Sequence, residues 1–143
     1  MPMHVNESAE NYLETILMLS QTHPVVRSVD IATELNFKKS SVSVAMKKLR
    51  ESHHIVVSPE GYITLTESGR EIADRIYERH TLLSSWLQRL GVDPQTAVDD
   101  ACRIEHVIST ESFEAIKKHI HEKMDAENWS ACIFHVIRLL QAL

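Results

Sequence analysis

The sequence predicts a mostly α-helical protein, and three observations lead to that fold class. Only three of the 143 residues are glycine, a residue type that often interrupts helices. Apolar residues recur at intervals of three and four through most of the chain, which is the period of an amphipathic helix. One β-branched stretch, residues 55–66 (IVVSPEGYITLT), departs from this period. We therefore expect helices along the chain, interrupted by one small β element.

The first predicted helix covers residues 8–21, and Ser8 is its candidate N-cap. Its apolar side is formed by Tyr12, Leu13, Ile16, Leu17 and Leu19. Another face carries the polar side chains of Glu7, Glu10, Asn11 and Glu14. Solvent exposure would explain this polar face, especially Glu7 and Glu10. A set of oxygen ligands for a metal ion is the alternative.

Two short helices follow, residues 28–36 and 38–52, joined by a tight turn. The expected inward-facing residues are Ile31, Ala32, Leu35, Val42, Ala45, Met46 and Leu49. Such a pair forms a helix-turn-helix. The β-branched stretch after it has Pro59-Glu60-Gly61 at its centre, which predicts a two-stranded hairpin. A hairpin in this place is the wing of a winged helix.

The second helix of this pair is basic. Its basic residues all precede its first acid, Glu51, and are Lys38, Lys39, Lys47, Lys48 and Arg50. Lysines neutralise phosphates, while Ser and Val side chains can contact base edges in a major groove. A solvated basic face is the common alternative, but the position before a wing favours double-stranded DNA. The predicted DNA-binding residues are Lys38, Lys39, Ser40, Ser41, Ser43, Val44, Lys47, Lys48 and Tyr62.

The second half of the chain predicts helices only. A long helix over residues 67–90 has Thr66 as its cap and ends at Gly91. Its expected buried seam consists of Ile72, Ile76, His80, Leu83, Leu87 and Leu90. Asp93-Pro94 begins the next helix.

That next helix is expected to bury Ala97, Ala101, Ile104 and Ile108. Further helices are predicted over residues 112–123 and from Glu127 to the C-terminus. The final stretch, SACIFHVIRLLQAL, is very apolar, which suits a helix in a subunit interface.

Bulk composition narrows the class of protein. No segment approaches the roughly 18 apolar residues of a membrane span, and the N-terminus lacks the pattern of a secretory signal. Cys102 and Cys132 both lie in apolar helical patterns and do not indicate a disulfide framework. We expect a soluble cytoplasmic protein. A net charge of −5 leaves DNA binding open, because binding depends on the local patch.

Three side chains in ACRIEHV indicate a metal site. Cys102, Glu105 and His106 have the spacing i, i+3 and i+4, so they project from one face of a helix. A thiol, a carboxylate and an imidazole together favour a transition metal over calcium or magnesium. His80 lies in the buried seam of the preceding helix. It is either a core histidine bonded to a carbonyl or carboxylate, or a further ligand.

Four motifs resemble one known family. They are ENYLETI, VDIATELNFKKSSVSVAMKKL, LTESGREIADRIYERH and DDACRIEHVIS. In order and spacing they are similar to the diphtheria-toxin repressor and manganese-transport regulator family. The resemblance implies a homodimeric, metal-activated repressor of metal-uptake genes, in the short two-domain form. Residues 1–70 would then form the winged helix-turn-helix DNA-binding domain, and residues 71–143 the all-helical metal-binding and dimerisation domain.

The resemblance also implies a ligand set. By position it consists of Asn11, Glu14, His80, Cys102, Glu105 and His106. Cys102 matches the iron branch of the family, and Asn11 stands where the family has Asp or Met. Val98 and Ser84 replace a His and a Glu that, in the iron branch, help form a second, ancillary metal site. The expected cofactor is a divalent transition metal, Mn²⁺ or Fe²⁺, with Co²⁺ or Zn²⁺ as alternatives in vitro. A thiolate shifts the preference away from Mn²⁺.

Two other functions stay open. A winged-helix regulator could sense an oxidant or an apolar ligand through Cys102, with His80 as an ordinary core residue. A small metal-dependent hydrolase could use His80, Glu105 and His106, but neither an HExxH motif nor a nucleophile motif is present. We therefore expect a regulator that is not an enzyme.

Overall fold

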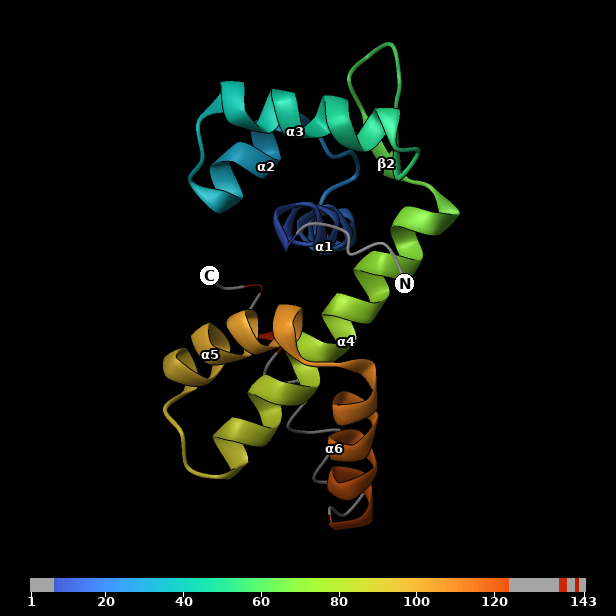
Figure 1. Cartoon of the computed structure of the whole chain (residues 1–143). Helices are drawn as coiled ribbons and strands as arrows, with labels where there is room; N and C mark the ends of the chain where they lie inside the picture. The colour runs from blue at the N-terminus through green and yellow to red at the C-terminus, as the bar shows by residue number, and fades with distance from the viewer. Residues whose placement is uncertain (1–6, 124–136, 139–140, 142–143) are drawn as a thin grey trace. The chain divides into compact units, whose positions relative to one another are not determined.

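The structure is a computed structural model that describes residues 7–123, 137–138 and 141. Its elements are α1 (Glu7–Thr22), α2 (Ser28–Leu35), α3 (Lys39–Glu51), β1 (Ile55–Val57), β2 (Ile63–Leu65), α4 (Glu67–Arg89), α5 (Pro94–Val107) and α6 (Thr110–Lys123) (Figure 1). A mostly helical fold with one small β element is thus confirmed. The predicted helix from Glu127 to the C-terminus lies for the most part outside the described residues. None of the described helices is long and apolar enough to cross a membrane.

The chain divides into two compact units, Met1–Arg75 and Ile76–Leu143. This division falls within α4, five residues after the boundary predicted between residues 70 and 71. The predicted domain limits stay a prediction, and each unit is described below by itself.

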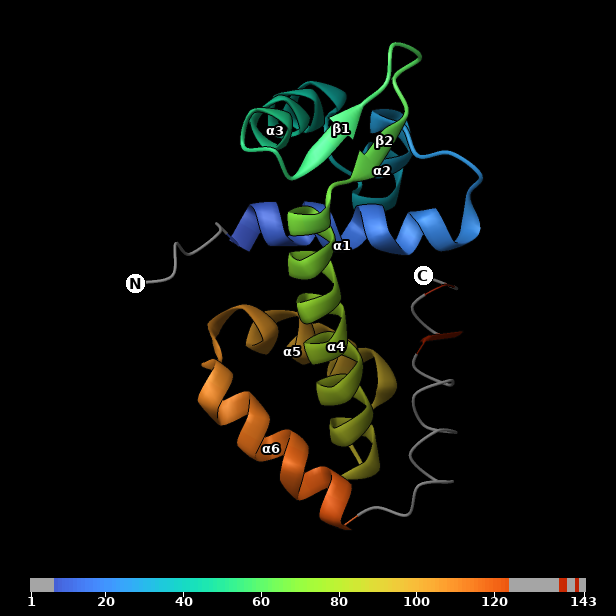
Figure 2. The same ribbon diagram turned by 90° about the vertical axis from the view of Figure 1, so that its right-hand side faces the viewer.

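In the first unit, α1 packs against α2, α3 and β2 and runs beneath them (Figure 2). All five residues predicted for its apolar side are buried. The inward residues of α2 and α3 are buried as well, apart from the half-buried Leu35 and Ala45. Burial of the Val, Leu, Ile and Met side chains among them, each contributing roughly 1.5–3 kcal/mol, holds the helix-turn-helix together. Ser8 lies inside α1, which the structure describes from Glu7 onward, so the prediction of Ser8 as its N-cap is wrong.

The wing is a short antiparallel hairpin, as predicted. Ile55 pairs with Leu65 and Val57 with Ile63, so each strand has only three residues. Gly61, with φ 86°, provides the left-handed residue that the connecting turn requires. Inside the turn, the Ser58 N–H donates to the Tyr62 carbonyl over 2.9 Å.

The wing leads directly into α4 through a tight joint. The Thr66 hydroxyl accepts from the Gly69 N–H over 3.2 Å, which confirms Thr66 as the cap of α4. The Thr66 N–H donates to the His54 carbonyl over 3.1 Å. A Cβ atom at Gly69 would lie 2.0 Å from that carbonyl oxygen, so only glycine allows this approach.

The second unit has its core between α4, α5 and α6, formed by Leu82, Leu83, Ala101, Phe113 and Ile120. The Asp93 side chain accepts from the Gln95 and Thr96 N–H groups and caps α5, as predicted. The predicted seam of α4 is wrong at its end, because Leu90 is 65% exposed. The helix stops at Arg89 and the chain turns at Gly91, which has φ 99°, so Leu90 no longer follows the seam.

Candidate metal centre and DNA-binding surface

Three predicted ligands lie together in the second unit. His80 of α4 and Cys102 and Glu105 of α5 each offer a ligand atom, and these atoms all lie within 4.8 Å of one another. His80 and Glu105 are buried, whereas Cys102 is exposed. The group therefore has an interior side made of imidazole and carboxylate and a solvent-facing side made of sulfur.

Helical spacing brings these groups together. His80 lies four residues after Ile76 and three before Leu83, on the buried side of α4. Glu105 lies four residues after Ala101, and both residues are 0% exposed. Cys102 is three residues before Glu105, so it lies on the same side of α5 but nearer the edge of its buried stripe.

The buried carboxylate of Glu105 lies between two imidazoles. Its Oε2 is 2.7 Å from Nδ1 of His80, and its Oε1 is 3.3 Å from Nε2 of His106. A buried carboxylate is costly unless hydrogen-bonding or charged groups accompany it. Two histidines within reach meet this need. The His106 side chain is only 1% exposed and therefore belongs to the same buried polar cluster.

This donor set fits a transition metal. Thiolate, imidazole and carboxylate form bonds of about 2.0–2.3 Å to such ions, so neighbouring ligand atoms in a tetrahedral site are about 3.3–3.8 Å apart. Because the ligand atoms of the group lie within 4.8 Å of one another, small side-chain rotations would bring them to that geometry. A histidine that gives its Nδ1–H to a carboxylate presents Nε2 to the metal, and such a carboxylate orients the ring.

Two further predicted ligands, Asn11 and Glu14, lie on α1 in the first unit. Glu14 is buried and Asn11 is half-buried. The solvated interpretation of their helix face holds for Glu7 but is wrong for Glu10, which is 8% exposed. Arg75 donates to the Glu10 carboxylate over 3.4 Å, and this cation is one partner that stabilises the buried acid.

Ser84 and Val98 do not supply the ligands of an ancillary site. The Ser84 hydroxyl is fully buried and donates to the His80 carbonyl over 2.6 Å, within its own helix. Val98 is buried and has no donor atom. Among the described residues, the group of potential metal ligands that lie within 4.8 Å of one another consists of His80, Cys102 and Glu105.

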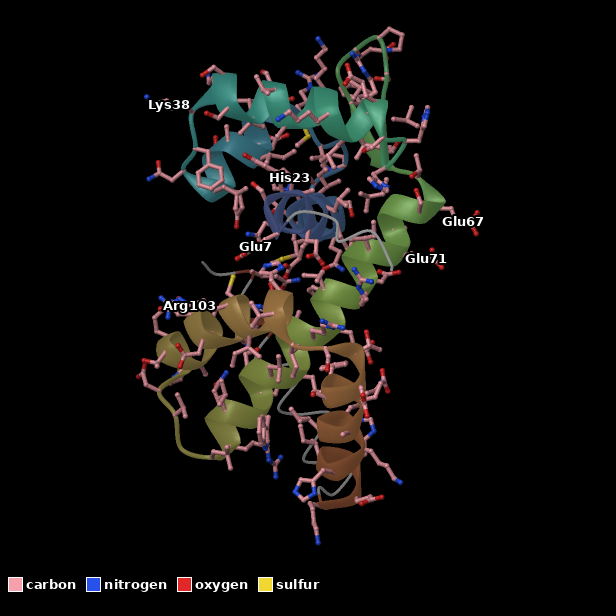
Figure 3. The ribbon with its side chains drawn as sticks, viewed as in Figure 1. Glu7, His23, Lys38, Glu67, Glu71 and Arg103 are labelled. Atoms are coloured by element: carbon pink, nitrogen blue, oxygen red, sulfur yellow. The ribbon has the colours of Figure 1, made fainter. Side chains whose placement is uncertain are left out.

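The predicted DNA-binding residues of α3 form one exposed surface. Lys39, Ser40, Ser41, Ser43, Val44, Lys47 and Lys48 are all exposed. Lys38 is exposed at the N-cap position of the helix and projects away from it (Figure 3). Val44 is 56% exposed, an apolar side chain in an otherwise polar face. The surface combines phosphate-binding lysines with small side chains that can approach bases.

Arg27 is a residue that sequence reasoning missed. Its guanidinium lies 4.9 Å from the centre of the Tyr62 ring, and its Nη2 donates to the Tyr62 hydroxyl over 3.2 Å. The pair ties the segment before α2 to the wing, and the Ile63 N–H reinforces it by donating to the Val26 carbonyl over 2.8 Å. Tyr62 is thus a predicted DNA-binding residue that is half-buried and held by a cation.

Two family models match the chain. The model for the iron dependent repressor, N-terminal DNA binding domain, matches residues 4–62. The model for the iron dependent repressor, metal binding and dimerisation domain, matches residues 66–125. The chain belongs to the iron-dependent repressor family. The winged-helix fold, the family resemblance and the class of metal-dependent regulator predicted from the sequence are therefore confirmed.

Individual relatives agree with this membership. An HTH-type transcriptional regulator from Methanocaldococcus jannaschii is 36% identical over 115 residues, which are 79% of this chain and 92% of that protein. The HTH-type transcriptional regulator MntR from Listeria monocytogenes is 37% identical over 109 residues, 76% of this chain and 77% of the relative.

Solved structures give the same fold. A manganese-dependent transcriptional repressor in complex with manganese has a TM-score of 0.72 at 28% identity, covering 79% of this chain and 52% of that one. The T. acidophilum IdeR structure has a TM-score of 0.70 at 26% identity, covering 78% and 53%. The chain thus spans about half the length of these structures.

Proposed function

We propose that the protein is a cytoplasmic, metal-activated, dimeric repressor that controls genes of manganese or iron homeostasis. The observation that carries this proposal is the group formed by His80, Cys102 and Glu105. It lies in the part of the chain that matches a metal binding and dimerisation domain, while the lysine-rich α3 lies in the part that matches a DNA binding domain.

We assign the metal first to His80, Cys102 and Glu105. His106, whose imidazole lies against the Glu105 carboxylate, remains a further proposed ligand. The exposed Cys102 would close the site from the solvent side once its thiol is deprotonated. Asn11 and Glu14 of α1 complete the proposed ligand set. For these two residues the support is the family resemblance and the burial of Glu14, not a distance.

The donor chemistry narrows the choice of metal. The matching family models are named for an iron dependent repressor, and one similar structure is named for manganese. Both ions accept imidazole and carboxylate. A thiolate ligand favours softer ions, so we propose Fe²⁺ ahead of Mn²⁺ in this chain, with Co²⁺ and Zn²⁺ as useful probes.

The metal would act by changing which conformation is populated. Metal binding would favour one arrangement of the paired α3 helices in the dimer. Their spacing must match DNA half-sites about one helical turn apart. A coupling of about 1–3 kcal/mol between the two binding events would change DNA affinity roughly 5–150-fold.

A direct test uses a duplex selected from a randomised library by the metal-loaded protein. Under anaerobic conditions we expect Fe²⁺ or Mn²⁺ to tighten binding of this duplex at least fivefold relative to chelator, and Glu14→Ala to abolish the gain. Equal affinity with metal and with chelator would contradict the proposal.

The exposure of Cys102 favours one second candidate, a regulator that senses oxidants through this thiol. That function predicts that Cys102→Ser abolishes a response to peroxide, while Glu14→Ala leaves the response intact. The metal-activated function predicts that both variants lose activation by metal.

A further inference from the structure

Arg79 is a buried cation beside the candidate metal centre. It is 7% exposed and directly precedes His80 on α4. Burying a guanidinium is expensive unless its N–H groups find acceptors, so the position of Arg79 has to be explained by what it contacts.

The guanidinium of Arg79 binds the end of α5 and the start of α6. Its Nη1 donates to the Glu105 carbonyl over 3.1 Å and to the Ile108 carbonyl over 2.8 Å. Its Nη2 donates to the Thr110 hydroxyl over 3.2 Å. The face of the group lies 5.4 Å from the centre of the Phe113 ring.

The two carbonyl acceptors are groups that a helix end leaves unsatisfied. α5 ends at Val107, and its last carbonyls lack partners within the helix. A cation at this end also meets the negative pole of the helix dipole. Arg79 therefore serves as a C-terminal cap for α5 that is supplied by a different helix.

The same contacts reach the metal centre. Glu105 is held at two points by neighbouring residues of α4: its carbonyl by Arg79 and its carboxylate by His80. The two contacts together fix both the position of the α5 backbone and the direction of the Glu105 side chain. Cys102 lies one turn earlier on α5 and therefore depends on the same placement.

We propose that Arg79 is a positioning residue for the metal centre, because it holds the last turn of α5 where Glu105 and Cys102 face His80. Arg79 does not itself touch the metal. This inference rests on the proposed metal site. The competing explanation is that Arg79 only stabilises the helical packing, with no specific effect on the ligands.

Co²⁺ titration of the full-length protein, prepared metal-free and under anaerobic conditions, separates these explanations. Sulfur ligation by Cys102 gives a thiolate-to-cobalt absorption band, so both affinity and ligand geometry are read directly. We expect Arg79→Gln and Arg79→Lys to weaken Co²⁺ binding about 10–100-fold and to lower the intensity of this band. Thr110→Val removes one acceptor and is expected to weaken binding about 2–10-fold.

Two controls distinguish positioning from stability. Ile120→Val removes a methylene from the core of the same unit and lowers its stability, while it leaves the acceptors of Arg79 in place. Arg103→Gln removes an exposed arginine from α5, where Arg103 pairs with Asp100 over 3.4 Å. Both controls should keep the wild-type Co²⁺ affinity and absorption band.

The outcomes are separable. If the Arg79 and Thr110 variants fold and bind Co²⁺ with wild-type affinity and band intensity, the positioning role is overturned. If the Arg79 and Thr110 variants lose no more Co²⁺ affinity than Ile120→Val does for the same loss in free energy of unfolding, Arg79 only stabilises the helical packing. If Arg79→Gln does not fold, Arg79→Lys and Thr110→Val decide by the same two readouts. A wild-type protein that forms no thiolate–cobalt band instead overturns the proposed site itself.

Discussion

The basic surface of α3 and the buried cluster around Glu105 use ionisable groups in opposite ways. In the first unit, the lysines of α3 are exposed around an apolar helix-turn-helix core. In the second, Arg79, His80 and Glu105 are buried and contact one another across α4 and α5. Exposed charges can be changed at little cost in stability, whereas buried ones depend on their partners. The surface of the first unit is thus suited to phosphates in water, and the interior of the second to a dehydrated ion.

The largest effect should come from the centre of the buried cluster. Glu105→Gln removes the charge that His80 and His106 face, so we expect loss of metal activation, that is, of the whole gain of about 5–150-fold in DNA affinity. We also expect the free energy of unfolding to fall by about 1–3 kcal/mol. Anaerobic duplex binding and urea unfolding measure the two effects. The exposed Glu71 of α4 (Figure 3) gives the matched control, Glu71→Gln, which should change neither value. A Glu105→Gln variant that behaves like this control would contradict the account.

The exposed basic surface should show the opposite pattern. Lys47→Ala is expected to weaken DNA binding roughly 3–10-fold and to reduce the slope of log affinity against log salt by about one. Its free energy of unfolding should stay within about 0.5 kcal/mol of the wild-type value. The slope is measured by titrating the duplex with protein at salt concentrations between about 50 and 200 mM. An unchanged salt slope would remove Lys47 from the set of phosphate contacts.

Lys117 forms an ion pair with Glu78 in the second unit, and this pair is intermediate in exposure between the α3 lysines and the buried cluster. A hydrogen bond to Glu78 is the main cause that raises the pKa of Lys117 above its usual 10.5. A raised pKa stabilises the folded state below pH 10.5, and this contribution is lost as the pH rises through the higher folded-state value. Since both side chains are partly exposed, Lys117→Met should lower the free energy of unfolding at pH 7 by at most about 1 kcal/mol. A loss of several kcal/mol in urea unfolding would show that this pair behaves like the buried cluster.

The smallest effect is expected at the wing. The pKa of Glu60 is lowered by hydrogen bonds from its backbone and from Ser58, so its carboxylate is ionised at neutral pH. A negative charge at the wing tip repels phosphates, and Glu60→Gln should therefore strengthen duplex binding by roughly twofold at low salt. The difference should vanish as the pH falls through the lowered pKa. If the Glu60→Gln variant bound the duplex more weakly than the wild type, the Glu60 carboxylate would instead make a favourable contact in the complex.

The fold could be predicted well because its signals are local. Apolar spacing places the buried residues of α1, α2 and α3, and Thr66, Gly91 and Asp93 mark helix ends through their own chemistry. Leu90 shows the limit, because a spacing pattern continues in the sequence after the helix has ended.

The site was less predictable because it joins separate helices. The spacing of Cys102, Glu105 and His106 can be read from one helix, but the 2.7 Å contact between His80 and Glu105 depends on how α4 packs against α5. Arg79 was missed although it lies three residues after Ile76, on the buried side of the same seam. A charged residue at a seam position was the signal that could have found it.

The coupling between metal and DNA is the central claim, and its reciprocity gives the most direct measurement. Metal affinity is measured anaerobically for the wild-type protein alone and for the protein saturated with its selected duplex. Since linkage requires equal effects in both directions, the account predicts that DNA tightens metal binding by the same factor by which metal tightens DNA binding, about 5–150-fold. Identical metal affinities with and without the duplex would contradict it.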